Sequence, residues 1–283
     1  MTTLPSGPGE ASETGTGAYD RAQASHLQRQ VAEGFGADPG RYDRTRPTYP
    51  ADLVDRIIAA SPGRNVLDVG CGTGISARLF QAAGCRVLGV DPDPRMAELA
   101  RQGGTETEVA KFEDWDPSGR TFDVVIAAQA WHWVDPVAGA PKAAAVLRPS
   151  GRLAVFWNAF DPPKDLRQAF AEVFRRVLPD SPSGSFWARP AVDAYRVGCA
   201  RAADAMRQAG AFGEPEEWLS CWERPYTRDE WLDLVPTTGG FTQRPEAIQT
   251  ELLDGLGAAV DAAGRTFIMS YTTIAATAAR LAS

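Results

Sequence analysis

Short apolar runs alternate with helical segments through the first half of the chain. Residues 65–69, 85–90 and 122–128 carry almost no polar alternation, and a segment with helical spacing follows each of them. Such runs are typical of strands buried on both faces of a parallel sheet. The alternation predicts an α/β fold with a Rossmann-like, doubly wound, mostly parallel sheet. Seven strands are expected, at residues 65–69, 85–90, 107–110, 122–128, 151–158, 216–226 and 265–273.

The alternation ends after Asn158, where two long helical segments follow each other. We therefore expect residues 41–158 to form a cofactor-binding α/β core. Residues 159–214 are expected to be a helical cap inserted over the active-site end of the sheet. Residues 215–283 are expected to add the last strands and helices of the core.

The N-terminal segment is predicted to lie outside this core. Residues 1–17 are rich in Gly, Ser, Thr, Pro and Glu and contain no aromatic residue, a composition that does not offset the entropy of ordering the chain. We expect them to be a disordered tail. Residues 18–40 have apolar positions four apart and are predicted to form a lid helix. Residues 41–50 contain two prolines and are predicted to be extended.

Composition narrows the class of partner. With 29 Lys and Arg against 36 Asp and Glu the net charge is −7, which argues against a nucleic-acid-binding surface. No window approaches the roughly 20 apolar residues of a membrane span, and the first residues lack a secretory pattern, so a cytoplasmic location without membrane contact is expected. The four cysteines are too widely spaced for a C-x-x-C site, which predicts reduced thiols and no structural metal.

The segment VLDVGCGTG, residues 66–74, carries the chemistry. A hydrophobic strand runs into three alternate glycines and then into a helix, and glycine allows both a tight turn and a close approach of the backbone to a ligand. Asp91 ends the next strand, where a carboxylate accepts hydrogen bonds from two ribose hydroxyls. A dinucleotide site would place a glycine at position 75, but Ile75 stands there. The spacing favours another nucleoside-containing cofactor.

This segment resembles the first motif of the class I S-adenosylmethionine (SAM) dependent methyltransferases. VLGVDPDPRM resembles their second motif, FDVVIAAQAWHWV the fourth, LRPSGRLAVF the fifth and SYTTIAATAAR the last strand. The upstream Y-x-x-x-R-P-x-Y-P segment and AxxWHWV are similar to the small-molecule branch, which includes trans-aconitate-type and natural-product methyltransferases. The resemblance covers about residues 35–280 and implies SAM as cofactor and S-adenosylhomocysteine (SAH) as product.

The resemblance also implies the cofactor contacts. Gly70, Gly72 and Gly74 form the loop beside the methionine and ribose portions. Asp68 organises that loop or receives the amino group through a water, and Asp91 holds the ribose. The other implied contacts are Met96, Phe112 and Glu113 on the adenine side, Gln129 near the methionine, and Tyr42 and Arg46 at the cofactor carboxylate. The family often has an acidic and then a small residue in its third motif, where this chain has Lys111 and Phe112. Without the resemblance, Met96 also suits a position in the core and Arg46 a position on the surface.

Methyl transfer from a sulfonium is an in-line displacement, so the protein mainly aligns the acceptor and excludes water. Histidine suits a base near neutral pH, and the chain has two. His132 follows the fourth strand between two tryptophans and is the expected base, with Tyr19 of the lid helix as a second catalytic residue. His26, Trp133 and Trp157 are expected to contact the acceptor. A packing role for His132 and an exposed helix bearing Tyr19 and His26 stay open.

All eight tryptophans lie at or beyond Trp115, in the half expected to form the pocket and cap. This density favours a planar acceptor, such as an indole- or phenol-like intermediate of secondary metabolism. The sequence therefore predicts a methyltransferase that acts with base assistance on a small molecule, as a monomer or homodimer. Esterification of a small carboxylate held by arginines of the cap, a ligand-binding protein without catalysis, and a nicotinamide-dependent oxidoreductase are the alternatives.

Overall fold

The computed structural model describes residues 34–179, 187 and 190–282. Within them lies a seven-stranded sheet in the order β3-β2-β1-β4-β5-β7-β6, in which β1 to β5 run parallel and β7 is antiparallel to both of its neighbours. The predicted Rossmann-like, mostly parallel sheet is confirmed. The strands are β1 (Asn65–Val69), β2 (Arg86–Asp91), β3 (Glu106–Val109), β4 (Phe122–Ala128), β5 (Leu147–Asp161), β6 (Glu216–Thr227) and β7 (Thr266–Ala279).

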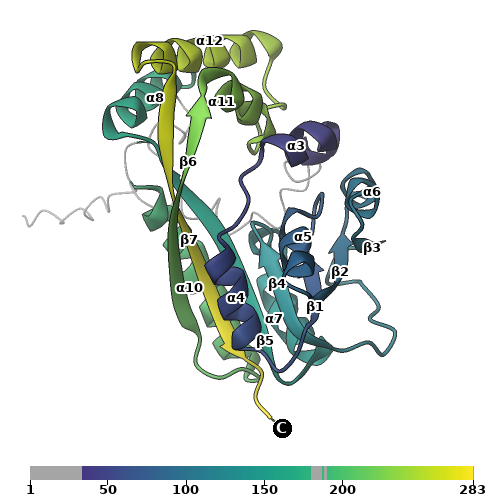
Figure 1. The fold of residues 1–283 in the computed structure, drawn as a ribbon. Helices are drawn as coiled ribbons and strands as arrows, with labels where there is room; N and C mark the ends of the chain where they lie inside the picture. Colours follow the sequence, from purple (N-terminus) through teal and green to yellow (C-terminus); the bar gives the residue numbers. More distant parts are fainter. Residues whose placement is uncertain (1–33, 180–186, 188–189, 283) are drawn as a thin grey trace, which may run out of the picture.

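Helices cover both faces of the sheet, as Figure 1 shows. Alternate residues of the central strands are buried on opposite faces: Val66 and Val124 pack with residues of α4 and α5, whereas Leu67 and Val125 pack with residues of α7 and α10. Burial on both faces explains the apolar runs without polar alternation. The helical elements are η2 (Phe35–Ala37), α3 (Pro39–Thr45), α4 (Ala51–Ala59), α5 (Ile75–Ala82), α6 (Pro94–Gln102), η3 (Trp131–Trp133), α7 (Pro136–Val146), α8 (Lys164–Val177), α10 (Ala191–Ala209), α11 (Arg228–Leu234), η4 (Val235–Thr237) and α12 (Glu246–Ala262).

A cap stands beyond the carboxyl ends of the parallel strands, formed by α8, α11, α12 and the outer parts of β5, β6 and β7 (Figure 1). β5 pairs with β4 up to Phe156 but with β7 up to Asp161, so these strands continue past the sheet into the cap. There Phe170 of α8 stacks on Trp231 of α11 with ring centroids 5.5 Å apart. The cap therefore has its own aromatic core.

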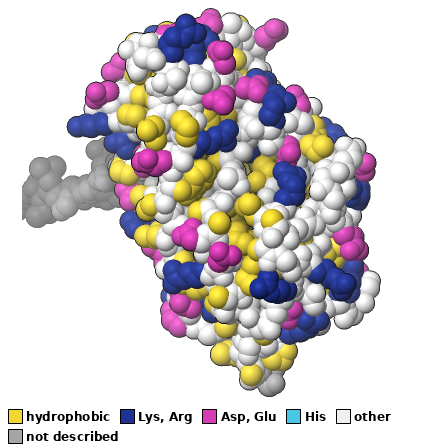
Figure 2. All heavy atoms as spheres, in the orientation of Figure 1, with side chains coloured by type: hydrophobic (Ala, Val, Ile, Leu, Met, Phe, Trp, Pro, Cys, Tyr) yellow, Lys and Arg dark blue, Asp and Glu magenta, His cyan; other side chains and the backbone are white. Residues whose placement is uncertain are grey.

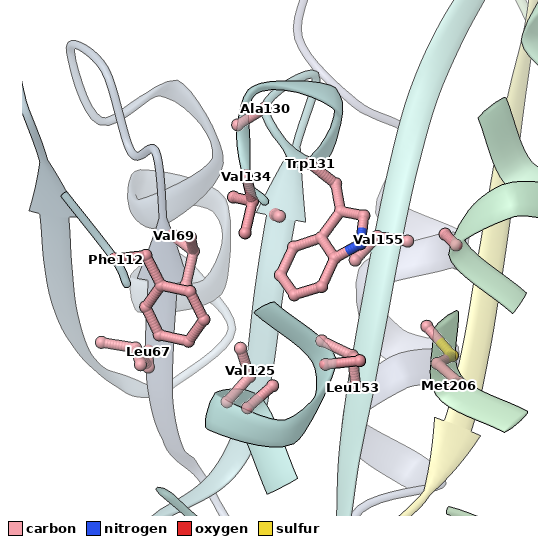
Figure 3. Packing of buried hydrophobic residues seen from close by; sticks show 14 of the residues in the cluster. Leu67, Val69, Phe112, Val125, Ala130, Trp131, Val134, Leu153, Val155 and Met206 are labelled. Atoms are coloured by element: carbon pink, nitrogen blue, oxygen red, sulfur yellow. The ribbon is translucent and has the colours of Figure 1, made fainter. Parts of the chain in front are cut away.

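The two helices of residues 159–214 have different neighbours. α8 packs on α12 in the cap, whereas α10 packs on α7, β5 and β7. Cys199, Ala202 and Met206 of α10 join the cluster on one face of the sheet, where Figure 3 shows Met206 beside the strands. Conversely, α11 and α12 from the last part of the chain complete the cap. The cap is thus assembled from segments on both sides of α10.

Residues 41–45 belong to helix α3, where the prolines had predicted an extended chain. Asp38 caps this helix by accepting a hydrogen bond from the Arg41 amide at 2.9 Å, and Pro39 occupies the first turn. The chain becomes extended only at Arg46, because Pro47 excludes the helical conformation at the residue before it. A new helix begins at Pro39, so the helix expected over residues 18–40 does not continue to residue 40.

Two strands are longer than their apolar runs predicted. β5 begins at Leu147, which pairs with Phe122 before a shift of register, and β7 continues to Ala279 along β5. The expected tail at residues 1–17 and most of the lid helix lie outside the described residues, together with Tyr19 and His26. None of the described helices is long and apolar enough to span a bilayer.

Candidate functional site

The glycine loop connects β1 to α5 at the carboxyl edge of the sheet. Gly70, Gly72 and Gly74 have φ angles of 66°, 55° and 85°, in the left-handed region that side chains disfavour. A Cβ on Gly70 would lie only 2.5 Å from the Cβ of Ala130, the residue that precedes η3. Glycine is required here because the loop turns tightly and touches the chain beyond β4.

Asp91 fixes this loop from the end of β2. Its carboxylate accepts hydrogen bonds from the Gly72 amide at 2.8 Å and from the Asp93 amide at 2.9 Å. Burial raises the pKa of Asp91 to about 6, although the two amide hydrogen bonds oppose the rise. A carboxylate has about four lone-pair sites, so acceptor capacity is left for hydroxyl groups of a ligand.

Asp68 is the second buried carboxylate of the loop and lies under it, on β1. Ser76 of α5 donates to Oδ2 at 2.6 Å, whereas Oδ1 is buried and has no hydrogen-bond partner among the described residues. Burial, with a contribution from the charge of Asp91, raises the pKa of Asp68 to about 7. An unpartnered buried acceptor is costly in isolation and suits a ligand that brings a donor or a positive charge. The ammonium and sulfonium charges of SAM fit this requirement.

The residues expected on the adenine side occupy different environments. Met96 of α6 is buried, and a Cβ on Gly72 would lie 3.6 Å from its terminal methyl group. Phe112 points into the core beside Val69, as Figure 3 shows. The Glu113 carboxylate accepts a hydrogen bond from the Asp135 amide at 2.6 Å. Met96 therefore lies against the loop, while the Phe112 ring and the Glu113 carboxylate have contacts within the protein.

Gln129 follows β4 with a φ of 56°, an uncommon conformation for a residue other than glycine. Such strain concentrates at functional sites. The backbone amide of Gln129 donates a hydrogen bond to the Phe156 carbonyl at 2.8 Å. The side chain of Gln129 lies near Tyr195 of α10: burial raises the pKa of Tyr195, and the charge of Arg46 and then the Gln129 side chain oppose the rise. Gln129 thus links the end of β4 to α10.

Arg46 lies between the core and the cap. It donates to the Thr237 carbonyl of η4, and its guanidinium lies 4.9 Å from the ring centroid of Tyr42 and 5.8 Å from that of Phe35. Its Nε is buried without a hydrogen-bond partner among the described residues, and none of their carboxylates forms an ion pair with it. The arginine is therefore suited to an anionic group of a ligand.

Four aromatic side chains lie together beside this arginine, and we call them the aromatic wall: Phe35, Tyr42, His132 and Trp133. The ring centroids of Phe35 are 5.9 Å from Tyr42 and 6.2 Å from Trp133, and His132 is 4.6 Å from Trp133. η2, which carries Phe35, lies against the loop after β2, because a Cβ on Gly36 would meet the Asp93 carboxylate at 1.9 Å. The wall therefore lies next to the loop after β2 and close to the glycine loop. In the view of Figure 2, hydrophobic side chains gather across the middle of the face, between the cap and the sheet.

Trp157 lies behind the aromatic wall, on β5. Its side chain is only 3% exposed, and its Nε1 donates to His132 Nδ1 at 3.2 Å. Burial among neighbouring atoms lowers the pKa of His132 to about 4, although the side chain keeps exposed surface. Trp157 reaches the site through its hydrogen bond to His132.

The structure thus brings together most of the residues chosen from the sequence at one edge of the sheet. Two residues were not chosen. Phe35 is one of the apolar positions four apart that predicted the lid helix, and Tyr195 belongs to a helix far along the chain whose packing on the sheet has no local signal. Tyr19 and His26 have no described position.

Comparison with known proteins agrees with this architecture. Residues 42–185, just over half of the chain, match the family described as Methyltransferase domain. The chain therefore belongs to the methyltransferase domain family, and the resemblance drawn from the glycine motif is confirmed. SAM is the methyl donor that this resemblance implies.

The relatives extend the comparison. An uncharacterized methyltransferase of Mycobacterium tuberculosis is 40% identical over 137 residues, which cover 47% of this chain and 56% of the relative. A demethylmenaquinone methyltransferase of Tropheryma whipplei is 32% identical over 130 residues, which cover 44% and 54%. The chain spans about half the length of these curated relatives. A solved type II methyltransferase of Anaeromyxobacter dehalogenans has a TM-score of 0.60 at 22% identity, over 84% of this chain and 99% of the other, and supports the fold.

Proposed function

We propose that this protein transfers a methyl group from SAM to a small organic acceptor. The observation that carries the proposal is the glycine loop between two buried carboxylates, with Asp68 Oδ1 left without a partner among the described residues. Asp91 binds the ribose hydroxyls, Asp68 faces the ammonium group and Arg46 binds the carboxylate of the methionine portion. These three contacts orient a molecule that carries charge of both signs.

SAM supplies an electrophilic methyl group on a sulfonium. The chain has to align the acceptor with that group and exclude water, because the leaving group departs as a neutral thioether without further assistance. In our proposal Gln129 and Ala130 border the methyl group and the aromatic wall holds the acceptor. The cap closes the site from the side opposite the sheet.

The acceptor is proposed to contain an aromatic ring. Phe35, Tyr42 and Trp133 offer half-buried ring surface, and aromatic rings pack favourably on one another in offset and edge-to-face arrangements. The demethylmenaquinone methyltransferases among the relatives are named for a quinone acceptor, which is compatible with this choice. We also propose, as the sequence predicts, a small-molecule acceptor, a role in secondary metabolism, a cytoplasmic location and a monomeric or dimeric state.

The test is SAH release with a panel of acceptors. We expect indole- or phenol-like acceptors to give SAH above the background without acceptor, whereas tricarboxylates give none. The Trp133→Ala variant should raise KM for the aromatic acceptor about fivefold, since a lost ring contact is worth roughly 1 kcal/mol. Turnover of carboxylates alone would favour esterification. SAM binding without turnover of any acceptor would favour a non-catalytic binding protein.

A further inference from the structure

The hydrogen bond between Trp157 and His132 restricts what the histidine can do. An indole Nε1 is a donor only, so the Nδ1 of His132 must be the acceptor and carry a lone pair. A neutral imidazole has one proton, which then resides on Nε2. Trp157 is held in the core at 3% exposure, so this donor keeps its place.

We propose that Trp157 is a positioning residue that holds His132 in the Nε2–H tautomer, so that His132 serves the methyl acceptor as a hydrogen-bond donor and not as the base expected from the sequence. The environment agrees with a neutral ring, since burial lowers the pKa of His132 to about 4. Neither ring nitrogen then takes a proton at neutral pH: Nδ1 is engaged by Trp157 and Nε2 already carries one.

The donor role has a consequence for the acceptor, which rests on the proposed function. The acceptor atom forms its bond to the methyl carbon while the sulfur–carbon bond breaks and its electrons remain on sulfur. Without a protein base, an oxygen acceptor has to enter without its proton, whereas a ring carbon or a neutral nitrogen attacks through its own electrons and releases a proton to water afterwards. An ionised oxygen, as in an acidic phenol or an aromatic carboxylate, meets this condition and accepts a hydrogen bond from Nε2–H.

Nuclear magnetic resonance of the 15N-labelled full-length protein tests the tautomer without SAM or acceptor. Only His26 and His132 contribute imidazole signals, and a His26→Gln variant assigns them. We expect His132 at pH 7 to be neutral, with an unprotonated Nδ1 and a protonated Nε2, and to stay neutral down to pH 5. A proton on Nδ1, or a charged ring at pH 7, would overturn the proposal.

Two matched tryptophan variants separate the hydrogen bond from simple packing. Trp157→Phe removes the donor and keeps most of the ring, so we expect a mixture of the two neutral tautomers, with Nδ1 protonated in part of the molecules. Trp133→Phe removes ring area on the other side of His132 and should leave the Nε2–H form. Equal spectra in the two variants would mean that Trp157 does not select the tautomer.

Turnover supplies an independent readout for any acceptor that the panel identifies. Glutamine offers an N–H donor but no base, so His132→Gln is expected to retain at least tenfold more kcat than His132→Ala. Equal loss in both variants would contradict the donor role. Failure of SAM to bind at all would instead refute the proposed function, while leaving the tautomer measurement valid.

Discussion

Asp91→Ala is expected to weaken SAM binding by about 100-fold or more while the protein stays folded. The substitution removes the carboxylate that accepts hydrogen bonds from the ribose hydroxyls, and charge-assisted hydrogen bonds contribute roughly 1.5–3 kcal/mol each. The substitution also removes the acceptor of the Gly72 and Asp93 amides, whose hydrogen bonds hold the loop. The fold tolerates the change because a buried carboxylate with a pKa raised to about 6 carries a desolvation cost that alanine removes.

Isothermal titration calorimetry with SAM measures this effect, and circular dichroism checks the fold. Glu98→Ala is the matched control, since Glu98 is a carboxylate on the neighbouring helix α6 whose ion pair with Arg101 and hydrogen bond from Gln102 are both exposed. Its SAM affinity should equal that of the wild type. An Asp91→Ala variant with unchanged affinity would mean that the second motif does not hold the ribose.

Gly70→Ala is expected to abolish measurable SAM binding and to lower the melting temperature. An alanine at φ 66° costs roughly 1–2 kcal/mol in backbone strain. Its Cβ would also lie 2.5 Å from the Cβ of Ala130, so the glycine loop and the segment after β4 must separate. Both segments border the proposed cofactor, and a shift of this kind removes the fit of the site.

Gly104→Ala is the control that separates the cost of backbone strain from the cost of a steric clash. Gly104 has a φ of 86°, but a Cβ there would meet nothing within 4 Å. This variant should lose stability of roughly 1–2 kcal/mol from strain alone and bind SAM normally. Thermal unfolding and calorimetry on both variants give the comparison. If Gly104→Ala lost SAM binding as fully as Gly70→Ala, the contact with Ala130 would not explain why position 70 requires glycine.

Local patterns were sufficient for most of the sheet. Strands such as β1 and β4 are buried on both faces, so their apolar runs appear directly in the sequence. The glycines at 70, 72 and 74 mark the loop because all three adopt positive φ angles within one short turn. Helix α3 was not predicted because its start signals, Asp38 and Pro39, lie before residues 41–50, the segment that was expected to be extended. Its stop signal, Pro47, lies inside that segment but beyond the end of the helix.

Long-range contacts could not be predicted from the sequence. The placement of Tyr195 beside Gln129 depends on the packing of α10 against β5 and β7. The hydrogen bond from Trp157 to His132 joins residues 25 positions apart on different elements. Sequence reasoning identified His132 and Trp157 separately and gave the histidine the role of a base. Their relative geometry supports the opposite role, which no spacing rule reveals.

Calorimetry of the protein with SAM, SAH and NAD in parallel tests the proposed SAM site. We expect SAM and SAH each to bind one site per chain, because the two buried carboxylates and Arg46 match their charges. NAD should not bind, because Ile75 occupies the position where a pyrophosphate requires glycine. Binding of NAD with no binding of SAM or SAH would contradict the assignment of this site to SAM.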